Sequence, residues 1–177
     1  DPADASVTTY INIEKFKTTG IIWENSYSYK QLQASLGLSY IGRYNKLVET
    51  FTDTEQFLWS PELSGSIFYS IPRWTTSINF FYKYYGARPG YESLIDANKE
   101  PYVSPTRISD FHQADITLNK KLGPQLVLNI GVRNLLDTKN INSSSTVGDG
   151  AHSSASSSIP MSYGRSYFLG LNYSLTK

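Results

Sequence analysis

The sequence contains no cysteine, so neither a disulfide framework nor a thiolate metal site can form in it. Its formal net charge of only +1 argues against a nucleic-acid partner, which normally requires a basic surface. No run approaches the roughly 20 apolar residues of a transmembrane helix. Helical periodicity does not persist along the chain either. These absences exclude a disulfide scaffold and a helical membrane protein, and they leave β-structure as the main expectation.

Aromatic residues, by contrast, are abundant. They make up 14% of the 177 residues, and 14 of them are tyrosines. Tyrosine is favoured both in β-strands and at the interface between a membrane and water. The composition therefore indicates strands, and it is compatible with strands that cross a membrane.

Apolar and polar residues alternate in seven runs, at residues 11–29, 32–44, 59–71, 74–84, 113–119, 126–136 and 166–175. In the first run Ile11, Ile13, Ile21 and Trp23 all occupy odd positions, which predicts one strand that continues through Gly20 without changing face. Most runs are about 10 to 15 residues long, whereas strands of soluble sheets average about 5 or 6. A tilted strand needs roughly 9 to 11 residues to cross a bilayer.

The connections between the runs alternate in length. Short turns are predicted at residues 29–31, 71–73 and 122–124, and long loops at 46–56, 88–107 and 138–160. This alternation is typical of outer-membrane barrels, which have short periplasmic turns and long extracellular loops. We therefore predict an all-β fold, a transmembrane antiparallel β-barrel in the bacterial outer membrane. The side chains predicted to face lipid are Trp23, Leu36, Leu63, Phe80, Leu128 and Leu171, and those predicted to face the interior are Ser35, Ser64, Asn79, Asn129 and Asn172.

Two other architectures compete with this prediction. A soluble β-sandwich also has alternating strands, although its strands are shorter. A break at residues 18–20 would give eight strands and a complete small barrel or passive pore. With an unbroken first strand there are seven strands, and a periplasmic C-terminus then places the N-terminus outside. We therefore predict that residues 1–177 are the C-terminal portion of a larger barrel, which cannot fold alone because its two edges are open.

Four segments resemble TonB-dependent outer-membrane receptors. They are YINIEKFKTTGIIWE (10–24), LGLSYIGRYN (36–45), VRNLLD (132–137) and SYGRSYFLGLNYSL (162–175). They span nearly the whole chain, and the loop sequence AHSSASSSIPMSYGRSYF is similar to receptors of the Bacteroidota. The resemblance implies the last seven strands of a 22-stranded barrel, with the plug domain, the TonB box and the earlier strands in a missing N-terminal part.

The resemblance also implies a function and a set of partners. Such receptors actively import a scarce nutrient, and we expect a metal chelate such as a siderophore complex, haem or cobalamin. An oligosaccharide or a peptide is the alternative cargo. The expected partners are the N-terminal plug and barrel segment, TonB acting through that segment, outer-membrane lipid and lipopolysaccharide, and a surface lipoprotein.

In this family the substrate is held by extracellular loops and by side chains of the lumen. Position and parity select Arg43, Asn45, Lys83, Tyr85 and Gln113, with loops 88–107 and 138–160 above them. A lumen arginine is equally suited to pair with a carboxylate of the plug.

Aromatic side chains add to this predicted ligand site. Tyr91 and Tyr102 join Tyr85 as candidates for stacking on a flat chelate or sugar, although tyrosines at the outer rim also mark the membrane interface. His152 is either a contact to a metal chelate or haem, or a solvated loop residue.

The last strand resembles the C-terminal signal that barrel-assembly machinery reads, with Gly170, Tyr173 and Leu175 in the positions of the signal. Leu175 stands where the family commonly has an aromatic residue. Gly170 is predicted to permit close backbone approach or strand curvature. Further upstream, Asn134 and Asp137 are predicted to order a turn between strand and loop.

Nothing in the sequence indicates catalysis. There is no convincing nucleophile–base set, and His112 and His152 are 40 positions apart, neither in a spacing typical of metal ligands. We therefore predict a protein that is not an enzyme and that has no metal or cofactor of its own.

Overall fold

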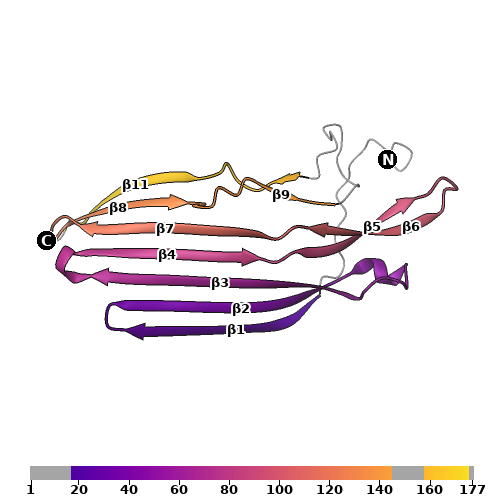
Figure 1. The fold of residues 1–177 in the computed structure, drawn as a ribbon, viewed down its shortest axis with the longest axis horizontal. Coiled ribbons are helices and arrows are strands. Elements are labelled where there is room, and N and C mark those ends of the chain that lie inside the picture. Colours follow the sequence, from indigo (N-terminus) through magenta and orange to yellow (C-terminus); the bar gives the residue numbers. More distant parts are fainter. Residues whose placement is uncertain (1–16, 145–157, 176–177) are drawn as a thin grey trace.

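A computed structural model describes residues 17–144 and 158–175. Seven strands form one antiparallel sheet in the order β1-β2-β3-β4-β7-β8-β11, which lies in a single layer (Figure 1). The order is that of the seven predicted strands along the chain. The strands are β1 (Thr18–Tyr29), β2 (Leu32–Tyr44), β3 (Phe57–Ile71), β4 (Thr76–Tyr85), β7 (Phe111–Lys121), β8 (Leu126–Arg133) and β11 (Ser166–Tyr173).

The first strand continues through Gly20, as predicted. Thr18 pairs with Arg43 and Gly20 with Ile41 in one uninterrupted ladder between β1 and β2. A side chain at Gly20 would lie 2.5 Å from the carbonyl oxygen of Tyr40, so the glycine permits close approach of the two strands. A break at residues 18–20 is wrong, because these three residues are paired within β1. The part of the first run before Lys17, with Ile11 and Ile13, lies outside the described residues.

Residues 88–107 are the predicted long connection between neighbouring strands of the main sheet, β4 and β7, but they form a hairpin that was not predicted. β5 (Arg88–Ile95) and β6 (Pro101–Ile108) pair as an antiparallel hairpin that projects past the end of the main sheet (Figure 1). At its tip the Asp96 carboxylate accepts hydrogen bonds from the backbone N–H groups of Asn98 and Glu100, at 2.8 and 2.9 Å. Prolines interrupt the alternation of both strands, which hides the hairpin in the sequence.

Shorter elements complete the connections. The 3-10 helices η1 (Lys46–Glu49) and η2 (Pro72–Trp74) follow β2 and β3. The short strands β9 (Asn140–Asn142) and β10 (Ser158–Pro160) pair antiparallel and join the two described ends of the 138–160 connection. Among the described residues, all three long connections therefore carry local secondary structure.

The strand register sorts side chains by polarity. Residues directly opposite each other in an antiparallel ladder share a face. Ser35 pairs with Ser66, and the neighbouring Leu36 lies on the other face. The predicted division into an apolar and a polar face is confirmed. One row crosses the apolar face through all strands from β2 to β11: Ala34, Ile67, Phe80, Ile116, Val132 and Tyr167.

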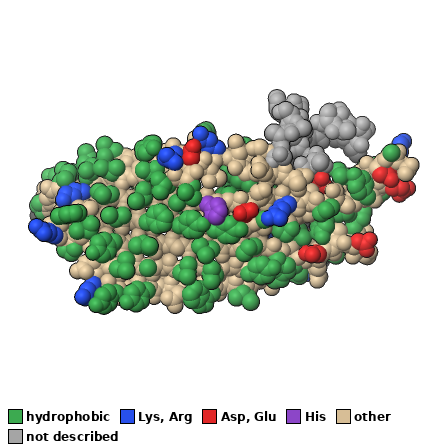
Figure 2. Space-filling view, in the orientation of Figure 1, with side chains coloured by type: hydrophobic (Ala, Val, Ile, Leu, Met, Phe, Trp, Pro, Cys, Tyr) green, Lys and Arg blue, Asp and Glu red, His purple; other side chains and the backbone are tan. Residues whose placement is uncertain are grey.

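The apolar face is uncovered. In the described residues only three hydrophobic side chains are buried, Phe111, Ala114 and Ile141, whereas Ile21 is 75% exposed and Leu169 is 70% exposed. Hydrophobic side chains cover most of the face seen in Figure 2. The described strands form no second sheet packed face to face on the first, so they do not form the alternative soluble sandwich. They also do not close into a barrel: β1 and β11 are the two edges of an open sheet.

Candidate functional site on the polar face and at the loop base

An ion cluster lies on the polar face toward the end that carries the long connections. The Glu62 carboxylate is 3.1 Å from the Lys83 ammonium and 3.9 Å from the Arg43 guanidinium. The Glu62 side chain is 18% exposed, and those of Lys83 and Arg43 are 27% and 34% exposed. Since two cations face one carboxylate, this partly buried cluster carries an excess positive charge.

Aromatic rings border the ion cluster. The Lys83 ammonium lies 4.3 Å from the centroid of the Tyr85 ring, and Tyr85 stacks on Phe111 with centroids 4.4 Å apart. Gln113 is the register partner of Lys83 on the adjacent strand. The structure therefore brings together Arg43, Lys83, Tyr85 and Gln113, four of the residues selected from the sequence. An adjoining positive charge and flat ring suit an anionic group that carries a planar part.

The sequence reasoning missed Glu62 as the centre of the cluster. It follows Pro61 in a run of serines, and its parity placed it on the polar face without suggesting a role. Its negative charge was an available signal. Arg43 and Lys83 lie on the same polar face, and a carboxylate there is expected to pair with them.

Asn45 was predicted to contact ligand from the lumen, but in the structure it is a buried helix-capping residue. It is only 6% exposed and caps η1, because its side-chain oxygen accepts a hydrogen bond from the backbone N–H of Leu47 at 3.1 Å. Its amide nitrogen donates to the carbonyl oxygen of Glu55 at 3.0 Å. Both polar ends of the side chain thus hold the 46–56 connection in shape.

The candidate tyrosines of the β5–β6 hairpin do not come together. Tyr91 pairs with Pro105, whereas Tyr102 pairs with Leu94, so the two tyrosines lie on opposite faces of the hairpin. They cannot both stack on the same side of one ligand in this arrangement. His152 lies outside the described residues.

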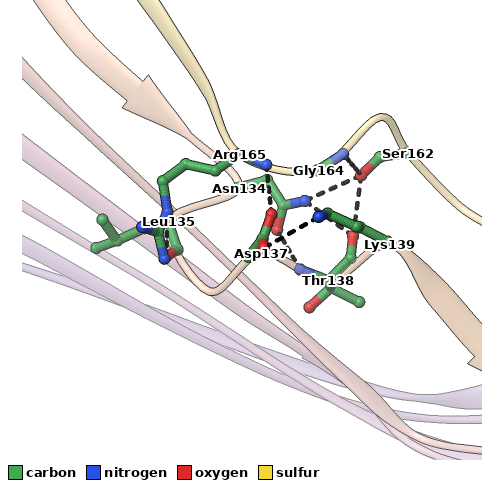
Figure 3. A network of polar contacts seen from close by, with 8 residues as sticks. All are labelled: Asn134, Leu135, Asp137, Thr138, Lys139, Ser162, Gly164 and Arg165. Atoms are coloured by element: carbon green, nitrogen blue, oxygen red, sulfur yellow. Dashed lines mark hydrogen bonds and ion pairs between the residues drawn. The ribbon is translucent and has the colours of Figure 1, made fainter.

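A polar network closes the base of the 138–160 connection (Figure 3). Asn134 has the left-handed φ of 52° and donates from its amide to the carbonyl oxygen of Thr138 and to the hydroxyl of Ser162, at 2.8 and 2.9 Å. Its side-chain oxygen accepts the Thr138 N–H at 3.0 Å, and its own backbone N–H donates to the Asp115 carboxylate at 2.8 Å. Asn134 thus ties the end of β8 to both sides of the connection and to β7.

Asp137 makes the second half of this network (Figure 3). Its carboxylate accepts the backbone N–H of Arg165 at 2.8 Å and lies 3.4 Å from the Lys139 ammonium. The hydrogen bond from Arg165, helped by Lys139, holds the pKa of Asp137 below its usual value. Gly164 has a φ of +93°, and a side chain there would collide with Asp137 and Lys139. The prediction that Asn134 and Asp137 order this turn is confirmed.

Arg165 contributes to the network rather than extending freely from the last strand. It precedes β11, and its Nε donates to the carbonyl oxygen of Leu135 at 3.0 Å. Arg165 therefore joins the SYGR segment to the RNLLD turn through both its backbone and its side chain.

The residues of the predicted assembly signal lie at the end of the sheet. Gly170 and Tyr173 are in β11, and Leu175 follows it with 88% exposure. A side chain at Gly170 would meet only Asn129, at an ordinary 3.8 Å, so close backbone approach is not the reason for this glycine. The Tyr173 hydroxyl donates to the Gln125 side chain at 2.9 Å.

In the part of the chain that the structure describes, no three His, Asp or Glu side chains are grouped as metal ligands. None of the described helices is long and apolar enough to span a membrane. Comparison of the chain with known protein families, curated proteins and solved structures finds no match.

Proposed function

We propose that this chain is part of the barrel of a TonB-dependent outer-membrane receptor that actively imports a scarce nutrient, with an anionic metal chelate as the preferred cargo. The missing N-terminal part supplies the plug, the TonB box and the other strands. The observation that carries the proposal is the uncovered apolar face of a long-stranded sheet whose opposite face is polar.

The dimensions of the apolar face support the membrane placement. On β3, Tyr69 and Trp59 lie ten residues apart, which is about 33 Å along a strand. At a strand tilt of about 40° this length projects to about 25 Å, the height of the apolar band of an outer-membrane barrel. Trp59 stacks on Tyr40 with centroids 4.9 Å apart, and Tyr29 and Trp74 are exposed at the opposite end. Aromatic side chains at both ends of an apolar band are typical of membrane interfaces.

The polar face supports a cargo with negative charge. Arg43 and Lys83 outnumber Glu62 in the ion cluster, and the Tyr85–Phe111 stack lies beside it. An anionic chelate gains charge-assisted hydrogen bonds from the cations and stacking area from the rings. The loop-base network holds the 138–160 connection at the same end, where extracellular loops lie in such a barrel.

Cysteine labelling tests the membrane placement, and the absence of native cysteine in this chain makes the labels unambiguous. We expect a membrane-impermeant maleimide to label Ala97→Cys, at the tip of the β5–β6 hairpin, in intact cells. Gly123→Cys should react only after the outer membrane is permeabilised, since it lies in the β7–β8 turn with open space around it. Leu36→Cys, in the apolar band, should react in neither case. Equal labelling at all three positions would exclude the proposed placement.

A second measurement tests transport. Cells should take up a labelled ferric chelate only when they carry both this protein and the inner-membrane TonB complex. Uptake that persists without the TonB complex would indicate a passive pore instead.

A further inference from the structure

Positive charge is concentrated at the end of the sheet that carries the short turns. This turn end comprises residues 27–34, 68–78, 117–128 and 171–175, all of which the structure describes. It contains Lys30, Arg73, Lys120 and Lys121 and no Asp or Glu. The long-connection end mixes both signs, as in Asp96, Lys99 and Glu100 of one hairpin tip. Figure 2 shows blue side chains and no red ones at the left end, whereas red and blue side chains both occur in the middle and at the right. Within these described ranges, four cations therefore have no Asp or Glu among them.

Backbone hydrogen bonds join the turns into one continuous rim. The Ser70 N–H donates to the carbonyl oxygen of Gln31, which links the β1–β2 turn to the end of β3. The Lys121 N–H donates in the same way to Thr75, next to Arg73 in the β3–β4 turn. Hairpins that are neighbours in a sheet lie about 10 Å apart, because strands are spaced by about 4.8 Å. Lys30 and Arg73 thus belong to the turns of adjacent hairpins on this rim.

Exposed aromatic rings stand beside these cations. The Lys30 ammonium lies 5.1 Å from the centroid of the Tyr29 ring, and the Lys120 ammonium donates to the backbone carbonyl of Trp74. Tyr29 is 56% exposed and Trp74 is 60% exposed. Lys120 belongs to the apolar face, since it pairs with Thr76 and Leu128. The contact of Lys30 with the Tyr29 ring and the bond of Lys120 to the Trp74 backbone therefore lie where the apolar face ends.

We propose that this turn end binds anionic phospholipid head groups of the membrane leaflet on its side. The inference rests on the proposed membrane placement. A tryptophan or tyrosine at the edge of an apolar band occupies the head-group level, and an adjacent Lys or Arg then reaches the phosphates. An acidic surface attracts each such cation with a free energy equivalent to about a fivefold change in binding. An acidic soluble protein would match the charge but not the two exposed rings at the edge of the apolar face.

Fluorescence quenching of Trp74 tests the proposal on the complete protein, purified with all its chains and reconstituted in bilayers. Trp74 is kept as the sole tryptophan, with Trp23→Phe and Trp59→Phe in this chain. The bilayers contain either acyl-brominated phosphatidylglycerol or acyl-brominated phosphatidylcholine, and the ratio of the two quenching curves gives the relative lipid affinity at the rim. We expect phosphatidylglycerol to bind at least about fivefold more tightly at low salt, with a smaller preference as salt is added.

The double variant Lys30→Asn with Arg73→Gln should reduce the preference severalfold, because each cation contributes up to about a fivefold change and only Lys120 and Lys121 remain. Lys99→Asn is the matched control, because Lys30 and Lys99 both have left-handed φ values, 50° and 67°, which asparagine tolerates. This control lies at the opposite end and should leave the preference unchanged.

The possible failures are distinguishable. Equal quenching by the two lipids, or a preference that the double variant leaves unchanged, overturns the head-group proposal and leaves the membrane placement intact. Quenching by neither lipid overturns the membrane placement itself.

Discussion

The sharpest test of the membrane placement is an arginine at Leu36. This side chain lies on the apolar face, four residues from Leu32 and four from Tyr40 on the same strand. Leu32 pairs with Tyr69 at one end of the apolar band, and Tyr40 stacks on Trp59 at the other. Leu36 is therefore near the middle of the band, where a lipid-facing charge is most costly.

The expected magnitude separates a membrane sheet from a soluble one. An arginine on the lipid face near the midplane costs about 2 to 4 kcal/mol, which lowers the folding equilibrium constant about 30- to 700-fold. Leu36 is 42% exposed in this structure. If water covered this face, the same change would be a surface substitution, worth within about 0.5 kcal/mol. The difference between these outcomes exceeds the error of an unfolding measurement.

Two matched variants give the assay its controls. Ser35 is the neighbouring residue on the polar face, so Ser35→Arg should cost under about 1 kcal/mol, mainly through its lost hydrogen bond to Ser66. Leu32→Arg, at the edge of the band, should cost about 0 to 1 kcal/mol. Reversible denaturant unfolding of the complete protein in bilayers measures all three free energies. If Leu36→Arg is no more destabilising than Ser35→Arg, the placement of this face in lipid is wrong.

Three further perturbations test the packing and the charges. Gly131→Ala should destabilise the sheet by about 1 to 3 kcal/mol, because its new methyl group would overlap the Phe168 ring and lie 2.8 Å from a backbone oxygen. Gly170→Ala is the control and should be tolerated. Equal unfolding free energies of the two variants would contradict this prediction. Glu62→Gln should lower the unfolding free energy by about 1 to 3 kcal/mol in the same assay, since it leaves two partly buried cations without a counter-charge. This loss should be larger than that caused by Glu49→Gln. Asp137 should stabilise the loop base above its ordinary pKa, and this contribution should be lost as the pH falls through its lowered folded pKa. Amide protection factors at the loop base, which are corrected for the slower intrinsic exchange in acid, should therefore decrease as the pH is lowered, and a pH response unchanged in Asp137→Asn would refute the assignment.

The main sheet was predicted well from the sequence because side chains along a strand alternate with a period of two residues. Every second side chain faces the same way, so parity alone assigned Leu36 and Ser35 to opposite faces before any register was known. The pairing order followed because short turns force consecutive strands to be neighbours. The continuity of β1 through Gly20 could be predicted for the same reason, since the positions before and after the glycine have the same parity.

What the sequence could not predict depends on contacts across strands. Glu62 meets Lys83 and Arg43 only through the register of three strands, which alternation does not specify to the residue. The β5–β6 hairpin was not predicted because prolines interrupt the alternation of apolar and polar residues in both of its strands. At the loop base, Asn134 and Asp137 were recognisable as turn residues. Their partners Ser162 and Arg165, 28 residues further along in each case, were not.

The open edges of the sheet lead to a last prediction, that this chain does not form a stable membrane barrel by itself. In an antiparallel ladder every second residue of an edge strand directs its N–H and C=O groups away from its only neighbour. β1 has twelve residues, so about six pairs of such groups point outward along that edge alone. Each unsatisfied group costs several kcal/mol in lipid, so the edge costs on the order of tens of kcal/mol.

That cost exceeds the roughly 5 to 15 kcal/mol by which folded proteins are usually stable. Under the proposed membrane placement we therefore expect further strands to pair with β1 and β11, supplied by the proposed N-terminal barrel segment. Residues 1–177 expressed alone should not yield a heat-resistant monomer in detergent, whereas co-expression with the upstream segment should. Electrophoresis of unheated and heated samples distinguishes the two states. A heat-resistant monomer from the isolated chain would show that the edges close on each other, and the 22-stranded assembly would then be wrong.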